Sequence, residues 1–209
     1  ASPPAKFVIF SLTELPVDPN GNLVYNTSAA ASVSNLSCSV TEGDASRMEE
    51  GSETGTSKTL VFAVNGCRFE LSDVDPSTTL IELLRTRTPF KSVKLGCGEG
   101  GCGACVVLLS KYDEIVGKVE DFTISACLTL LCSLHGCSIT TTEGLGNSKD
   151  RFHPIHERFA GFHASQCGFC TPGMCMSLYG ALVNAGISKL TAFEAEEAIA
   201  GNLCRCTGY

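Results

Sequence analysis

The residues of this sequence best suited to chemistry are its cysteines, of which there are thirteen in 209 residues. Three of them share one glycine-rich stretch, "KLGCGEGGCGACVV", where four residues separate Cys97 from Cys102 and two separate Cys102 from Cys105. Cys127 follows after 21 further residues. This is the spacing of plant-type [2Fe–2S] clusters. Glycines in such a loop allow tight turns and let backbone N–H groups point at anionic sulfur.

Two other uses of these cysteines fit less well. A zinc site also takes four thiolates, but usually from two C-x2-C-like pairs and not from three cysteines in one glycine-rich loop. Disulfides belong mainly to secreted proteins and usually involve an even number of cysteines. Here the number is odd, the cysteines are clustered, and "FVIF" at residues 7–10 is too short for the apolar part of a secretory signal.

A second group of cysteines lies near the end of the sequence. Cys167 and Cys170 stand two residues apart in "SQCGFCTPG", and Cys204 and Cys206 stand one residue apart in "GNLCRC". Taken alone, these pairs fit a four-cysteine zinc site, a redox-active pair or a second cluster. A second cluster is the interpretation that the neighbouring motif favours, since a protein with one one-electron centre has a use for another.

The elements around the first group predict a small mixed domain over residues 59–145. Two β-rich runs about Asn65-Gly66 in residues 59–71 indicate a hairpin. Thr79 and Glu82 have the spacing of a capping box at the start of a helix. Further strands are predicted from the β-rich runs at residues 104–112, 118–127 and 137–143.

The elements around the second group are helical and occupy residues 150–209. Residues 153–162 have the pattern of an amphipathic helix. Thr171-Pro172 predicts an N-cap and a helix that reaches about Ala185. Thr191 with Glu194 is a capping box for a helix that runs into Gly201. Residues 1–58 are polar over much of their length, and we interpret them as a disordered leader.

The two cysteine motifs together resemble a known family. From Thr59 to Tyr209, with "GCGEGGCGAC" and "QCGFCTPGM…GNLCRCTGY", the sequence resembles the N-terminal iron–sulfur region of the molybdo-flavoenzymes, the xanthine dehydrogenase and aldehyde oxidase family. The segments "VNGCRFEL", "FKSVKL" and "GFHASQCGFCTPGM" are similar to plant aldehyde oxidases in particular.

The resemblance implies an α+β fold in which a β-grasp, plant-type ferredoxin-like domain is followed by an all-α helical-bundle domain. It implies one [2Fe–2S] cluster in each domain. The implied ligands of the first are Cys97, Cys102, Cys105 and Cys127, and those of the second are Cys167, Cys170, Cys204 and Cys206.

The same resemblance implies the function of an electron-transfer segment in an aldehyde oxidase-like molybdenum hydroxylase. Electrons would pass from a molybdopterin centre through both clusters to FAD as aldehydes are oxidised to carboxylic acids. Gln166 and Cys167 would lie near the pterin, and no residue of this chain would be catalytic. Family members continue after "CRCTGY" into flavin and molybdenum-pterin domains, so we expect the chain to be a fragment cut at its C-terminus. The parent enzyme is expected to be a homodimer.

Three alternatives stay open. The chain could be a xanthine dehydrogenase fragment, a stand-alone iron–sulfur subunit of a heteromeric molybdenum hydroxylase, or a zinc-binding interaction module. The net charge of −7 argues against nucleic acid or an anionic membrane as partner. No apolar run approaches the ~20 residues of a membrane span. We expect a cytoplasmic protein.

The other cysteines and the histidines are expected to be structural. Four cysteines (Cys67, Cys132, Cys137 and Cys175) are interpreted as small buried apolar residues, although Cys132 and Cys137 follow Cys127 closely enough to be rival ligands. Cys38 would be an exposed thiol in the leader. A Rieske cluster would need two histidine ligands, and His153 and His156 lack a suitable cysteine pair.

Overall fold

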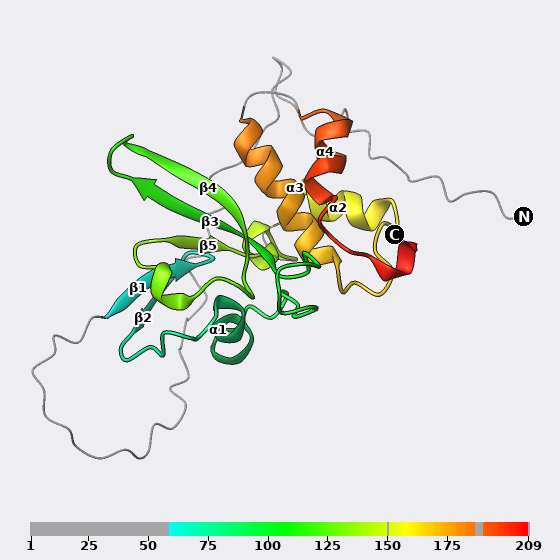
Figure 1. Cartoon of the computed structure of the whole chain (residues 1–209). Helices are drawn as coiled ribbons and strands as arrows, with labels where there is room; N and C mark the ends of the chain where they lie inside the picture. The colour runs from blue at the N-terminus through cyan, green and yellow to red at the C-terminus, as the bar shows by residue number, and fades with distance from the viewer. Residues whose placement is uncertain (1–58, 150, 187–189, 209) are drawn as a thin grey trace, which may run out of the picture.

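The computed structural model describes residues 59–149, 151–186 and 190–208. The predictions of a disordered leader over residues 1–58 and of an exposed Cys38 therefore lie outside the described residues. Within the described ranges, the fold is a mixed α/β arrangement with a five-stranded sheet and α-helices that follow it in the sequence. Figure 1 shows the sheet on one side and α2, α3 and α4 gathered on the other.

The chain enters the sheet through the predicted hairpin. Strand β1 (Leu60–Val64) pairs antiparallel with β2 (Cys67–Leu71). Both turn residues, Asn65 and Gly66, have positive φ (50° and 79°), as the two central residues of a type I′ turn require. The rings of Phe62 and Phe69 stack across the two strands with centroids 5.7 Å apart. The hairpin prediction is confirmed.

The sheet has the strand order β2-β1-β5-β3-β4. Strand β3 (Val106–Asp113) pairs antiparallel with β4 (Lys118–Ser125). Strand β5 (Ser138–Thr140) lies between them and the hairpin, parallel to β1 and antiparallel to β3. The three β-rich runs predicted from the sequence are thus confirmed as strands. Short 3₁₀ turns, η3 (Leu131–Ser133) and η4 (Thr142–Leu145), flank β5.

Helix α1 (Leu80–Arg87) contributes Leu80, Ile81, Leu83 and Leu84 to the main hydrophobic core. The helix is confirmed, but the capping box expected at Thr79 is wrong, because Thr79 makes no side-chain capping bond. The free N–H groups of the first turn are satisfied from elsewhere. Leu80 donates to the Thr129 carbonyl at 2.8 Å and Ile81 donates to the Ala126 carbonyl at 3.0 Å.

Three helices follow the sheet: α2 (Pro154–Gly161), α3 (Thr171–Ala185) and α4 (Ala192–Ile199). The capping box at α4 is confirmed, since Thr191 Oγ1 accepts from Glu194 N–H and the Glu194 carboxylate accepts from Thr191 N–H. The predicted N-cap of α3 is one residue off. Cys170 is the cap residue, and Thr171 is already helical, with its hydroxyl 2.8 Å from that of Ser165. A last turn, η5, spans Arg205–Thr207.

Helix α3 lies against β3 and β4 (Figure 1). One close approach involves Gly180, where an added Cβ would lie 2.2 Å from the Thr123 Cγ2 atom and 3.5 Å from a methyl group of Leu108. Met176 of the helix is buried with Leu108 and Leu145. No helix in the described ranges is both long and apolar enough to span a membrane.

Candidate metal centres

The first cysteine group occupies the loop between α1 and β3 and the position just after β4. Cys105 directly precedes β3 and Cys127 follows β4, so both are held by paired strands and both are buried. Their thiols form a hydrogen bond with each other. Cys97, which is exposed, forms a hydrogen bond with Cys102, and Cys102 interacts electrostatically with Cys105. The structure therefore brings the four predicted ligands together as two linked pairs.

Backbone donors point at the exposed sulfur of this group. The N–H groups of Glu99 and Gly101 donate to Cys97 Sγ at 3.4 and 3.2 Å. These bonds, led by that from Glu99, lower the pKa of Cys97 from 9.0 to about 7. Donors of this kind stabilise a thiolate and surround cluster sulfur in iron–sulfur proteins. Burial has the opposite effect on Cys105, whose pKa it raises to about 11.

The glycines of the loop make room for the sulfur atoms. A Cβ on Gly96 would lie 2.7 Å from Cys102 Sγ, so a larger residue would displace the thiol. Gly103 has a φ of +68°, and its added Cβ would lie 2.5 Å from the side-chain amide nitrogen of Asn202. The loop therefore needs glycine at two positions: at Gly96 because the Cys102 sulfur lies close to it, and at Gly103 because Asn202 of the C-terminal segment lies close to it.

The second cysteine group joins the loop before α3 to the segment after α4. Cys167 and Cys170 occupy the loop before α3, and Cys204 and Cys206 follow α4. The Cys167 thiol forms a hydrogen bond with Cys206, and the Cys170 thiol forms one with Cys204. Electrostatic interactions also join Cys167 to Cys170 and to Cys204. These four predicted ligands are again brought together in two linked pairs.

The local environment separates the acidities of this group. The N–H of Phe169 lowers the pKa of Cys167, and the Thr207 hydroxyl lowers the pKa of Cys204. Burial raises the pKa of Cys170 to about 11. Cys170 is the cap residue of the fifteen-residue helix α3, but burial outweighs the helix dipole, because the net effect is a raised pKa.

Both groups have the donor set and the pairing that a [2Fe–2S] cluster needs. Among the described residues, no three Cys, His, Asp or Glu side chains are arranged to hold a single metal ion. A [2Fe–2S] cluster makes a different demand, because its four thiolates are shared between two irons. Two thiol pairs, with amide donors and small residues around the sulfur, meet that demand.

The two cysteine groups touch each other through residues that the sequence did not single out. Leu203 N–H donates to the Cys102 carbonyl at 2.9 Å, and Asn202 Nδ2 donates to the Gly103 carbonyl at 2.9 Å. A Cβ on Gly173, in the first turn of α3, would lie 2.0 Å from the Gly103 oxygen. Asn202 was missed because its partner lies 99 positions away; the only local signal was a polar residue beside "LCRC".

Of the other cysteines that the structure describes, Cys175 interacts electrostatically with Cys170 of the second group. Cys137 and Cys175 are buried free thiols as expected. Cys67 is buried too, but it is disulfide-bonded and not free. The expectation of burial is wrong for Cys132, which is exposed. The thiols of Cys132 and Cys137 lie 4.0 and 3.7 Å from the carbonyl oxygens of Pro76 and His135. The thiol that forms a hydrogen bond with Cys105 is that of Cys127, and not that of Cys132 or Cys137.

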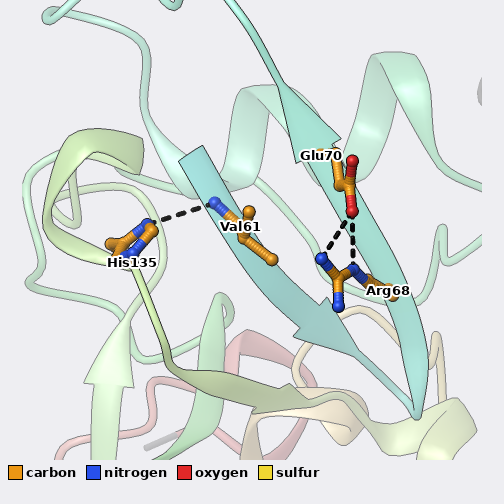
Figure 2. A network of polar contacts seen from close by, with 4 residues as sticks. All are labelled: Val61, Arg68, Glu70 and His135. Atoms are coloured by element: carbon orange, nitrogen blue, oxygen red, sulfur yellow. Dashed lines mark hydrogen bonds and ion pairs between the residues drawn. The ribbon is translucent and has the colours of Figure 1, made fainter. Parts of the chain in front are cut away.

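The histidines make structural contacts. His153 caps α2 by accepting the N–H of Ile155 at 3.2 Å, and its ring packs edge-on to that of Tyr179. His135 Nδ1 accepts the N–H of Val61 in β1 at 3.3 Å, as Figure 2 shows beside the exposed Arg68–Glu70 ion pair of β2. These contacts give His153 and His135 structural roles.

Comparison with known proteins identifies the class. A family described as "2Fe-2S iron-sulfur cluster binding domain" matches residues 62–138, and one described as "[2Fe-2S] binding domain" matches residues 141–209. The chain therefore carries two [2Fe–2S]-binding domains.

Individual relatives identify the family. An indole-3-acetaldehyde oxidase of Arabidopsis thaliana is 69% identical over 166 residues, which is 74% of this chain and 12% of that relative. An abscisic-aldehyde oxidase of the same plant is 69% identical over 153 residues, 72% of this chain and 12% of that relative. The chain thus spans about an eighth of the curated relatives it matches.

Solved structures agree with this assignment. Quinoline 2-oxidoreductase from Pseudomonas putida 86 is 32% identical with a TM-score of 0.61, covering 74% of this chain and 87% of that one. The aldehyde oxidoreductase from Desulfovibrio desulfuricans ATCC 27774 is 32% identical with a TM-score of 0.60, covering 71% and 15%. The chain belongs to the xanthine dehydrogenase and aldehyde oxidase family, of which it represents the iron–sulfur region.

Proposed function

We propose that this chain is the electron relay of an aldehyde oxidase-like molybdenum hydroxylase. Residues 59–145 form a β-grasp, ferredoxin-like domain, and residues 150–209 form a helical bundle. The strand order β2-β1-β5-β3-β4, with β1 and β5 parallel at its centre, supports the first assignment. The packing of α3 against both α2 and α4 supports the second.

Each domain holds one cluster in this proposal. The first pairs Cys97 with Cys102 on one iron and Cys105 with Cys127 on the other. The second pairs Cys167 with Cys206 and Cys170 with Cys204. The hydrogen bonds within these thiol pairs support this division. When bound, each cluster supplies a one-electron redox couple, which hydrogen bonds and burial tune.

The main support for an electron relay is the hydrogen bond from Leu203 N–H to the Cys102 carbonyl. It connects Cys102, a proposed ligand of the first cluster, to the residue next to Cys204, a proposed ligand of the second. Cys97 is exposed at one site and Cys167 and Cys206 at the other, so each site has a side open to further domains. In our proposal the second site faces a molybdopterin centre, with Gln166 and Cys167 nearest to it, and the first site faces FAD.

The relatives' names support an aldehyde as the substrate of the whole enzyme, with flavin and molybdenum-pterin domains as partners of this region. We place the enzyme in the cytoplasm as a homodimer. A stand-alone iron–sulfur subunit is the second candidate, because this chain covers 87% of the matched quinoline 2-oxidoreductase chain.

The test is a serine substitution of one ligand, followed by electron paramagnetic resonance of the reduced, reconstituted chain. Cys102→Ser is expected to remove one of two cluster signals and to leave the other. Cys132→Ser is the matched control, because this exposed cysteine lies outside both groups, and both signals should persist. If Cys102→Ser kept both signals and the full iron content, the ligand assignment would be wrong.

A further inference from the structure

The second cysteine group is built upon the backbone of the first cysteine loop. Two of its segments rest there: the C-terminal segment through Asn202 and Leu203, and the start of α3 through Gly173. The ring of Phe169, which stands between Cys167 and Cys170, would lie 3.5 Å from a Cβ on Gly96. The contact thus involves the residues next to two of the four ligands of the second site, Cys170 and Cys204.

Asn202 is the side chain that closes this contact. It is a polar residue with only 9% of its surface exposed, and its Nδ2 donates to the Gly103 carbonyl at 2.9 Å. A buried donor without its partner is costly, so the Asn202 side chain and the Gly103 carbonyl hold each other in place. Gly103 must be glycine for this approach, because a Cβ there would lie 2.5 Å from the Asn202 amide nitrogen.

Leu203 contributes a backbone hydrogen bond. Its N–H donates to the Cys102 carbonyl, while the residue is 51% exposed. Cys204 is the next residue, so the position of this ligand depends on the position of the Cys102 backbone. When the first loop is ordered around a cluster, the acceptors for Asn202 and Leu203 are ordered with it.

We propose that Asn202 is a positioning residue that couples the two sites, so that filling either site makes the other bind its cluster more tightly. The coupling is reciprocal, because a change in affinity caused by one ligand is returned by the other to the same degree. Its physical source is the ordering of residues 201–206, which an already ordered first loop makes less costly. This inference rests on the proposed function, since it takes both sites to be [2Fe–2S] sites.

The experiment is a double-mutant cycle on the full chain, reconstituted with iron and sulfide. The measured quantity is the iron and sulfide concentration that half-loads the second cluster, followed by its own resonance signal. Cys97→Ser disables the first site. In the otherwise unchanged chain this substitution is expected to raise the half-loading concentration about tenfold, the factor that a buried hydrogen bond can supply. With Asn202→Ala already present, the same substitution should change it less than about twofold.

Leu203→Ala is the matched control, because it shortens the neighbouring side chain and keeps its N–H; it should preserve the tenfold effect. A purely structural Asn202 would weaken the second site equally with or without Cys97, and that result would overturn the proposal. Failure of either cluster to form in the unchanged chain would instead refute the proposed function.

A second measurement needs no substitution. Amide hydrogen exchange at Leu203 in the full chain should be slowed at least tenfold relative to an unprotected amide, and more so once the first site is loaded. Exchange at the unprotected rate would overturn the proposal even if the Asn202 variant failed to fold.

Discussion

Replacing Gly173 by alanine probes the contact between α3 and the first cysteine loop. The added Cβ would lie 2.0 Å from the Gly103 oxygen and 3.0 Å from the Ala104 Cα atom. Both neighbours are backbone atoms, so the start of α3 must move by about 1 Å or more to restore normal contact. Overpacking of this kind costs about 1–3 kcal/mol, and the better helix propensity of alanine returns at most about 1 kcal/mol. A net loss of about 1–2 kcal/mol is expected.

Gly161→Ala is the matched control. Gly161 is the last residue of α2, and nothing lies within 4 Å of its added Cβ. Here only the propensity gain remains, so the free energy of unfolding should be unchanged or rise by up to about 1 kcal/mol.

The assay is urea unfolding of the metal-free chain followed by circular dichroism. With a slope of about 1–3 kcal/mol per molar urea, the Gly173→Ala midpoint should fall by roughly 0.3–2 M while the Gly161→Ala midpoint stays level or rises. Equal midpoints for the two variants would refute the close packing of α3 on the cysteine loop.

Two further predictions concern titration. Burial lowers the pKa of His153 from 6.5 to about 4. Between pH 6.5 and pH 4, the unfolded chain therefore binds a proton that the folded chain does not. The free energy of unfolding should be highest above pH 6.5 and should fall by about 2 kcal/mol toward pH 4, after allowance for the partial exposure of His153. His153→Asn should flatten this fall in urea titrations; an unchanged slope would contradict the assignment. In the metal-free chain, Cys97 should react with iodoacetamide half-maximally near pH 7 and well before Cys105, as peptide mapping would show; equal rates would contradict it.

The parts of the fold that depend on neighbours in the sequence were predictable. The Asn65-Gly66 hairpin and the Thr191–Glu194 capping box are both local patterns, and both formed. The Thr79 capping box had the same pattern and did not form, because carbonyls that follow β4 satisfy the first turn of α1. A local sequence pattern does not show which distant carbonyl groups will accept the N–H groups at the start of a helix.

In the candidate sites, too, local features were predictable and contacts between distant residues were not. Short loops limit where the thiols within each motif can lie, but the two sets of four predicted ligands were implied by the resemblance to the family and not by spacing alone. The contact between the groups was not predictable, because Asn202 and Gly103 are joined only by the tertiary fold. The exposure of Cys132 was also missed, since cysteine is commonly buried and nothing beside it in sequence indicates otherwise.

The central claim is that both cysteine groups hold [2Fe–2S] clusters. Its most direct test is the iron and acid-labile sulfide content of the chain purified without oxygen, together with its visible spectrum. Two clusters require about four irons and about four sulfides per chain, and they give the protein a red-brown colour. About two of each would leave Cys204 and Cys206 without a cluster. A colourless chain with zinc in place of iron would show that neither cysteine group holds a [2Fe–2S] cluster.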